Sequence, residues 1–105
     1  MVELPHPTRE QLRLEGVMAA LGHPIRMSIV HALASGEETF CGAIETGAPK
    51  STMTHHWRVL REAGVLHQRR SGRKLYLTLR RDDLDARFPG LLDLVLAEEP
   101  ALVLD

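Results

Sequence analysis

The sequence has few of the residues that mark a secreted or a membrane protein. Its single cysteine, Cys41, cannot form an internal disulfide. No run approaches the roughly 20 apolar residues that a membrane span needs. The opening residues MVELPHPTRE contain neither the basic nor the apolar segment of a secretory signal. We therefore expect a cytoplasmic protein with no membrane partner.

Length and composition narrow the class of protein further. The chain has 105 residues, which corresponds to one domain, 1–105. Hydrophobic residues make up 44% and charged residues 26% of it, as in a folded globular protein. It contains no glycine-rich phosphate loop, and no serine or cysteine has both a base and an orienting third group. The sequence therefore predicts a binding module without a cofactor and not an enzyme.

The formal net charge of −1 hides a strongly uneven distribution. Residues 1–49 hold three Arg and six Glu, residues 50–81 hold nine Lys or Arg and one Glu, and residues 82–105 hold one Arg and seven Asp or Glu. The three segments therefore carry −3, +8 and −6. A basic segment between acidic ones indicates a surface that faces a polyanion. A basic surface that is merely solvated is the alternative.

Hydrophobic periodicity predicts a mainly α-helical fold with a small β-hairpin. Two strand-like runs, 65–69 and 74–79, flank a turn at 70–73, where Gly72 suits a tight turn. Gly64 suits a left-handed helix end. Helices are expected over residues 8–21, from Pro24 to Gly36, over 40–45, over about 50–63, in a short segment from Asp82, and over about 90–98.

The predicted helix 50–63 carries most of the functional information. Met53, Trp57 and Leu60 recur at i, i+4 and i+7, which predicts one buried face. A helix, the three-residue turn 47–49, this helix and a hairpin follow one another in the order of a winged helix-turn-helix. The opposite face is polar and basic, with Lys50, Ser51, Thr54, His55, Arg58 and Arg61, and His56 is expected at the helix edge against backbone or phosphate.

We predict that helix 50–63 is a recognition helix and that the hairpin 65–79 is a wing. Small polar side chains can hydrogen-bond to base edges, whereas arginine and lysine neutralise phosphates. The alternative is a module that binds a protein through the same basic face, although this face lacks apolar anchors. The expected base or nearby phosphate contacts are Ser51, Thr52, Thr54 and His55, and the expected backbone contacts are Lys50, Arg58, Arg69, Arg70, Arg73 and Lys74.

Three stretches resemble the ArsR-type (arsenical-resistance-like) bacterial transcriptional repressors. They are LGHPIRMSIVHAL (21–33), TGAPKSTMTHHWRVLREAGVL (46–66) and RRSGRKLYLTL (69–79). They are similar to the family patterns DPxRLxIL, LSQPTVSxHLxxLxxAGLV and GRxxYYxL, and the resemblance covers about residues 14–98. It implies a homodimeric repressor that binds a palindromic double-stranded operator and is released by an effector.

The resemblance also implies a dimer surface on the first helix and on the last helix, which is expected over about residues 90–98. Independently, the leucines at 91, 92, 94 and 96 fall on more than one face of the last helix, which indicates a partner surface in so small a domain. Completion of the monomer core is the alternative. The candidate interface residues are Leu14, Val17, Met18, Leu91, Leu94 and Val95.

Many members of this family sense metals, but both metal patterns are incomplete in this chain. Where the family has CVCDL, residues 40–44 read FCGAI, with one thiol in place of two, and the last helix has no histidine. Soft and borderline ions require thiolates or imidazoles. We therefore expect no metal site and leave the effector unknown. Cys41 is expected to be a small buried hydrophobic residue. The alternatives are that Cys41 is a redox switch or that it forms a ligand site together with His6.

Overall fold

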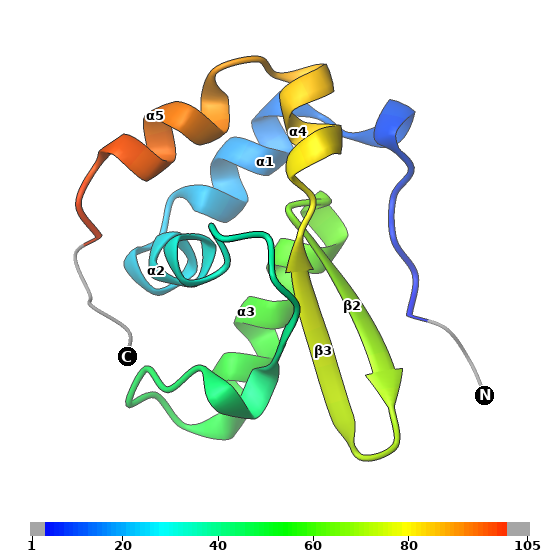
Figure 1. The fold of residues 1–105 in the computed structure, drawn as a ribbon, viewed down its shortest axis with the longest axis vertical. Coiled ribbons are helices and arrows are strands. Elements are labelled where there is room, and N and C mark those ends of the chain that lie inside the picture. The colour runs from blue at the N-terminus through cyan, green and yellow to red at the C-terminus, as the bar shows by residue number, and fades with distance from the viewer. Residues whose placement is uncertain (1–3, 101–105) are drawn as a thin grey trace.

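The fold combines helices with one small antiparallel sheet, seen in a computed structural model that describes residues 4–100 (Figure 1). The helix α3 lies beside the sheet, α4 and α5 lie beyond the base of the β2–β3 hairpin, and the hairpin tip projects away from them. In chain order the elements are η1 Arg9–Gln11, α1 Leu14–Leu21, α2 Pro24–Ala32, β1 Thr39–Phe40, η2 Cys41–Ala43, α3 Lys50–Ala63, β2 Leu66–Ser71, β3 Lys74–Leu79, α4 Arg81–Arg87 and α5 Leu91–Ala97.

The sheet has the strand order β1–β3–β2, with both pairs antiparallel. Ser71 pairs with Lys74, so the hairpin turn consists of two residues, Gly72 and Arg73. Gly72 has φ 62°, a conformation that favours glycine in a tight hairpin turn. The predicted hairpin is therefore confirmed: β3 has the expected bounds, and β2 extends two residues closer to the tip than expected.

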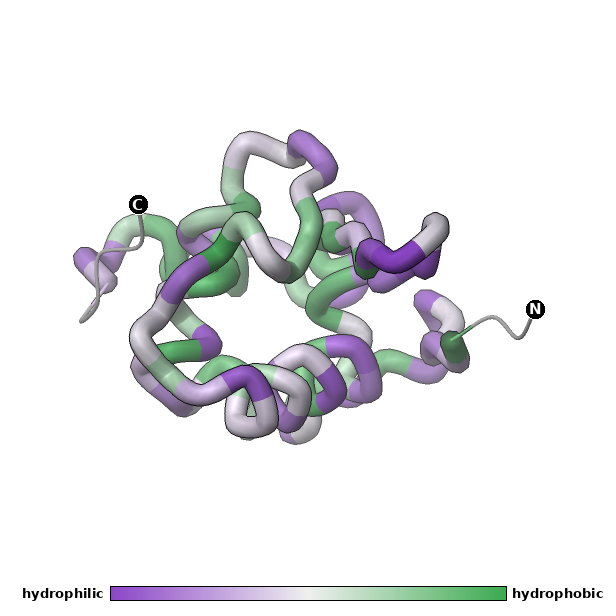
Figure 2. Tube along the Cα trace, turned by 90° about the horizontal axis from the view of Figure 1, so that it is seen from below, coloured by the Kyte–Doolittle hydropathy of each residue, from purple (hydrophilic) through white to green (hydrophobic). Residues whose placement is uncertain are grey.

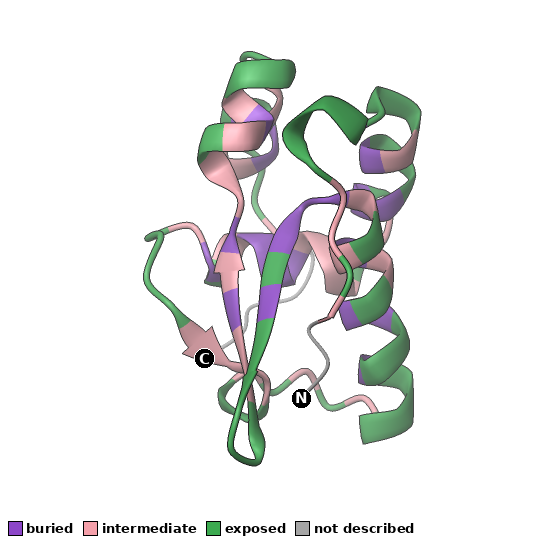
Figure 3. Ribbon diagram, turned by 90° about the vertical axis from the view of Figure 1, so that its right-hand side faces the viewer, coloured by how far each residue is buried: buried purple, intermediate pink, exposed green. Residues whose placement is uncertain are grey.

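One hydrophobic core joins all the longer helices to the sheet. Buried side chains cover the base of the hairpin, while its tip is exposed (Figure 3). The helix α3 packs against α1, α2 and β2, which places it along one side of this core. The most deeply buried members include Leu12, Val17, Ile29, Val30, Leu33, Leu60, Val65, Leu66, Leu77, Leu84 and Leu92.

The first predicted helix, 8–21, is wrong in its N-terminal half. Only a 3-10 turn forms at Arg9–Gln11, and α1 begins at Leu14. Between them Leu12 and Arg13 are extended, with ψ 136° and 131°. The break carries Leu12 into the core beside the end of α3, and that burial favours an extended residue over a continuous helix.

The predicted helix 40–45 is also wrong. Thr39 and Phe40 instead form β1, which pairs with Leu77 and Tyr76, and only a 3-10 turn follows. Ala43, expected to face inward, is exposed. Sheet pairing across 36 residues of sequence therefore decides this segment, against its local helical spacing.

The C-terminal helices are close to the prediction. Gly90, at φ 87°, precedes α5, so the helix begins one residue after this glycine and not at Pro89. Of the predicted loose tail, residues 101–105 lie outside the described part of the chain. Within residues 4–100, none of the helices has the length and apolar character that a membrane span requires. The architecture is that of a winged helix-turn-helix.

Candidate nucleic-acid interface

The helix α3 has one face buried in the core and the opposite face exposed to solvent. Met53, Trp57 and Leu60 are buried, which confirms the predicted inner face. Gly64 ends the helix in the left-handed conformation, with φ 85°. The outer face exposes all the side chains predicted to meet DNA from this helix: Lys50, Ser51, Thr52, Thr54, His55 and Arg58.

The N-terminal end of α3 has the electrostatics of an anion-binding end. Pro49 precedes the helix, and its carbonyl accepts a hydrogen bond from the amide of Met53 at 3.0 Å. The first turn contains Lys50 and no acidic residue. The unpaired amides and the helix dipole there attract phosphate. The Thr54 hydroxyl donates to the Lys50 carbonyl at 3.1 Å, so toward any further partner this oxygen can act only as an acceptor.

The position of His56 corrects the sequence prediction. Its side chain is only 4% exposed and does not lie at the DNA-facing edge. Because a guanidinium only donates, Nδ1 of His56 accepts the 3.1 Å hydrogen bond from Arg26. Nε of Arg26 donates in turn to the Ala20 carbonyl at 2.6 Å. This chain of contacts ties α3 to α2 and to the end of α1, and nothing in the local spacing of His56 signals it.

The neighbouring histidines do not form a metal site. Nδ1 of His23 accepts the amide of Ile25 at 3.1 Å, and the rings of His23 and His56 lie 4.6 Å apart. The single lone pair of each neutral imidazole is therefore already engaged. Burial lowers the pKa of His56, and the adjacent His23 and Arg26 lower it further. Over residues 4–100 the structure brings together no group of three or more metal-ligating side chains.

The strand register sorts the four wing cations onto different faces. On β2, Leu66 and Gln68 point into the body of the domain, and Arg69 points outward. Arg70 pairs with Leu75 and, by strand alternation, lies on the same face of β2 as Leu66 and Gln68, but beyond the edge of the core. Arg73 lies in the turn, and the hairpin tip is hydrophilic when the molecule is seen from this end (Figure 2).

The outward face of the sheet carries a row of stacked side chains. Nε and Nη2 of Arg69 both donate to the carboxylate of Glu38, at 2.7 and 2.6 Å. The guanidinium lies 4.6 Å from the ring centroid of Tyr76. The Tyr76 ring meets Phe40 edge-on at 6.3 Å, and Nζ of Lys74 lies 4.2 Å from the Phe40 centroid. Two wing cations, Arg69 and Lys74, therefore have partners within the domain.

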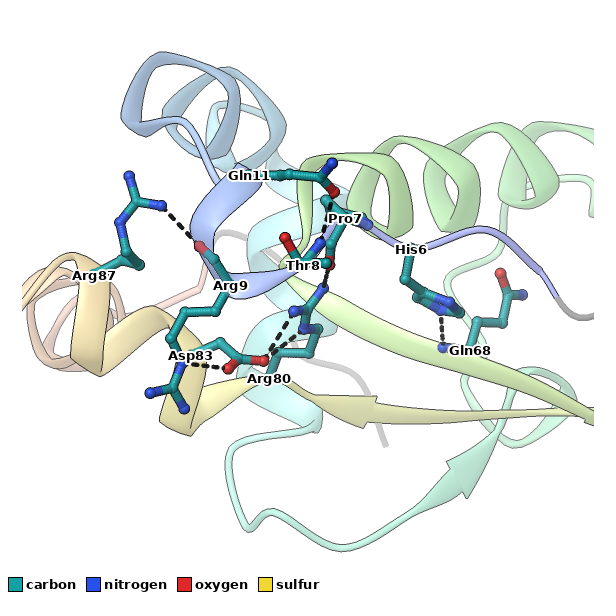
Figure 4. A network of polar contacts seen from close by, with 9 residues as sticks. All are labelled: His6, Pro7, Thr8, Arg9, Gln11, Gln68, Arg80, Asp83 and Arg87. Carbon is teal, nitrogen blue, oxygen red and sulfur yellow. Dashed lines mark hydrogen bonds and ion pairs between the residues drawn. The ribbon is translucent and has the colours of Figure 1, made fainter.

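The N-terminal segment runs along the free edge of β2 (Figure 4). The amide of Gln68 donates to Nε2 of His6 at 2.9 Å, which satisfies an edge-strand donor. Arg80 donates to the Pro7 carbonyl at 2.7 Å and to Asp83 at 2.9 Å. Asp83 also accepts from Arg9 at 2.7 Å, and these hydrogen bonds lower the pKa of the carboxyl. The segment is thus fixed to the wing and to α4.

Cys41 lies half-buried at the base of the wing. The buried side chain of Gln68 donates to its Sγ at 3.7 Å and accepts from Arg61 at 2.8 Å. Arg61 therefore links α3 to β2. Its spacing had predicted a position on the free face of the helix, and this prediction is wrong. Burial raises the pKa of the Cys41 thiol, which reduces its thiolate content and its reactivity. Nε2 of His6 is occupied by Gln68, which argues against a ligand pair with Cys41.

The candidate dimer residues divide into two groups. Leu14, Met18 and Leu94 are 44%, 55% and 64% exposed, and Leu91 is half-buried. Val17 and Val95 are buried inside the subunit, so they are not surface residues in this chain. The sequence could not separate them, because adjacent helical positions differ by only about 100° and the whole stripe is apolar.

Leu14, Leu91 and Leu94 lie close together on one side of the domain. Leu14, from α1, and Leu91 and Leu94, from α5, line a shallow pocket with Phe88. Two helices from opposite ends of the sequence therefore share an apolar surface.

The domain combines the helix α3, which has a buried apolar face and an exposed polar face, with a cationic hairpin. This combination defines a winged helix-turn-helix DNA-binding domain. A family described as a helix-turn-helix domain matches residues 21–69, which span α2, α3 and part of β2. The chain is 33% identical over 87 residues to an uncharacterized HTH-type transcriptional regulator, YceK, of Bacillus subtilis, covering 80% of this chain and 86% of the relative. It is 30% identical over 83 residues to a biofilm growth-associated repressor of Xylella fastidiosa, covering 72% of each.

The chain therefore belongs to the helix-turn-helix transcriptional regulators. It regulates transcription through DNA binding.

Proposed function

We propose that the protein is a homodimeric, ArsR-type repressor that binds a specific operator and is released by an effector. The arrangement of α3 carries the proposal: its apolar side, which includes Trp57, is buried, and the hydroxyl groups and the His55 imidazole face solvent beside the cationic hairpin. The resemblance of the three motif segments supports the ArsR type, and the similarity to the Xylella biofilm growth-associated repressors supports repression.

The proposed base contacts come from the first two turns of α3. Ser51, Thr52, Thr54 and His55 are exposed there, at the end of the helix that enters the major groove in this class of domain. The phosphate contacts would come from the helix and from the wing, which together span neighbouring stretches of the backbone. They are Lys50, Arg58, Arg70, Arg73 and Lys74, whereas the Arg69 side chain is already paired with Glu38.

The apolar surface shared by Leu14 and Leu94 supports the homodimer, as does the exposure of Met18 on the same helix as Leu14. A dimer places two recognition helices against two half-sites about one helical turn apart, so that protein symmetry matches a palindromic operator. The effector has no assigned site. Oxidation of Cys41 is the less favoured trigger, because burial keeps this sulfur protonated.

Fluorescence anisotropy with the protein's own promoter DNA tests the proposal. Ser51→Ala or Thr52→Ala should weaken operator binding by about 1–3 kcal/mol and leave binding to a scrambled duplex nearly unchanged. Arg70→Gln should lower the magnitude of the salt slope by about 0.9 on both duplexes. Equal affinity for operator and scrambled DNA would disprove sequence reading. A lack of any duplex affinity at physiological salt would instead favour the protein-interaction module.

A further inference from the structure

The wing exposes fewer available cations than its sequence contains. The side chains of Arg70 and Arg73 make no hydrogen bond or ion pair with any part of the chain that the structure describes. Arg69 is held in a bidentate ion pair by Glu38, and both of its bonds are short, at 2.6 and 2.7 Å. A bidentate carboxylate occupies the same donor fork that a DNA phosphate would use. Glu38 and a phosphate therefore compete for one guanidinium.

The tertiary structure places this pair where it can control the wing. Glu38 directly precedes β1, and β1 pairs with β3 on the side opposite β2. Phe40 pairs with Tyr76, and Tyr76 pairs with Arg69, so the three side chains lie in one cross-strand row. Cζ of Arg69 lies 4.6 Å from the centroid of the Tyr76 ring, so the guanidinium stacks on this ring. The arginine is thus oriented toward Glu38 by both the sheet register and the aromatic ring.

We propose that Glu38 is a charge-setting residue of the wing, which withholds Arg69 from the DNA backbone and leaves phosphate binding to Arg70 and Arg73. The inference rests on the proposed DNA binding of the wing and adds a specific restraint to it. Its consequence is a weaker non-specific affinity, because each withheld phosphate contact removes one counterion-release term. The regulator therefore depends more on base contacts by α3 than the number of its wing cations implies.

The test compares Glu38→Gln with Glu37→Gln in salt-dependent anisotropy on operator and scrambled duplexes. Glu37 is an exposed neighbour whose carboxylate has no hydrogen bond or ion pair in the described structure, so its variant removes the same charge without releasing an arginine. Glu38→Gln should tighten binding to both duplexes by roughly three- to tenfold at about 0.1 M salt and steepen the salt slope by about 0.9. Glu37→Gln should leave the slope unchanged.

Arg69→Gln in both backgrounds completes a double-mutant cycle. It should have little effect on the salt slope of the wild type and should abolish the gain of Glu38→Gln. A slope reduced by about 0.9 for Arg69→Gln in the wild type would overturn the proposal, because Arg69 would then already bind phosphate. Weaker binding by Glu38→Gln would also overturn it, since Glu38 would then position the wing for DNA.

A measurement on the unmutated protein does not depend on the folding of variants. The Nε–H resonance of Arg69 in NMR should shift little when DNA is added, whereas those of Arg70 and Arg73 should shift strongly. The reverse pattern contradicts the proposal. If the wild type binds no duplex, the proposed function itself fails, and this outcome is distinct from binding that Glu38→Gln leaves unchanged, which overturns only the role of Glu38.

Discussion

Arg26 donates a hydrogen bond to the buried Nδ1 of His56 at 3.1 Å and thereby joins the recognition helix α3 to α2. The same guanidinium reaches the Ala20 carbonyl at the end of α1 at 2.6 Å. The orientation of α3 relative to the rest of the domain therefore depends on a neutral imidazole, because a protonated ring has no lone pair for Arg26.

We expect stability to fall as the medium becomes mildly acidic. Burial, with His23, Arg26 and His55 nearby, holds the pKa of His56 below the ordinary 6.5, so the unfolded chain takes up the proton first. The contribution to the free energy of unfolding is complete above about pH 6.5 and declines as the pH falls below it. Urea unfolding between pH 7.5 and 5.5, followed by Trp57 fluorescence, measures the slope.

His56→Gln should reduce this pH dependence, because the amide oxygen can still accept from Arg26 but does not titrate. His55→Gln is the matched control, since it removes an exposed imidazole from the same helix and should change the slope far less, because His55 is the smallest of the causes that lower the pKa of His56. Part of the dependence should remain in His56→Gln, because burial and the stacked His67 also lower the pKa of His6. An identical slope in His56→Gln and the wild type would contradict the role of His56.

Gly64→Ala should be strongly destabilising. Gly64 has φ 85°, and a Cβ at this position would collide with the buried side chain of Leu12. We expect a loss of about 3–4 kcal/mol from backbone strain and overpacking together. Gly36 has φ 83° but no atom within 4 Å of the added carbon, so Gly36→Ala isolates the strain at about 1–2 kcal/mol. If urea unfolding showed the same loss of stability for both variants, Leu12 would have moved aside at no cost, and the overpacking argument would be wrong.

Two arginines that share one carboxylate should differ in importance. Arg80 is largely buried and bridges Asp83 to the Pro7 carbonyl, whereas Arg9 is exposed. Arg80→Met should lower the free energy of unfolding by about 2–4 kcal/mol and make the N-terminal segment susceptible to proteolysis. Arg9→Gln should have a much smaller effect, because an exposed ion pair is screened by solvent. Similar protease sensitivity in both variants would refute the distinction.

The corrected dimer surface predicts opposite effects for two adjacent residues. Leu94→Glu should dissociate the dimer without destabilising the subunit, because Leu94 is exposed. Val95→Ala should preserve dimerisation and lower subunit stability by about 1–3 kcal/mol, because Val95 is buried. Analytical ultracentrifugation and urea unfolding separate the two effects. A monomeric wild type would refute the homodimer, and a dimeric Leu94→Glu would place the interface elsewhere.

Sequence reasoning succeeds where a structural signal is local. The buried face of α3 follows from the spacing of Met53, Trp57 and Leu60, and the helix spans Lys50–Ala63, the range that this spacing predicts. It fails where a partner lies far away in the chain. The segment at Phe40 has helical spacing but joins the sheet through Tyr76. His56 is expected at the helix edge from its position but is buried and hydrogen-bonded to Arg26.

The order of amino acids alone determined an amphipathic helix, a glycine-turned hairpin and a strongly basic middle segment, because periodicity and turn chemistry act over a few residues. Only the tertiary structure decided which cations are available. Arg69 and Arg70 are neighbours in the chain, yet strand alternation turns them to opposite faces, and Glu38, 31 residues from Arg69, binds only one of them. Such pairing depends on register and long-range packing, which no local pattern encodes.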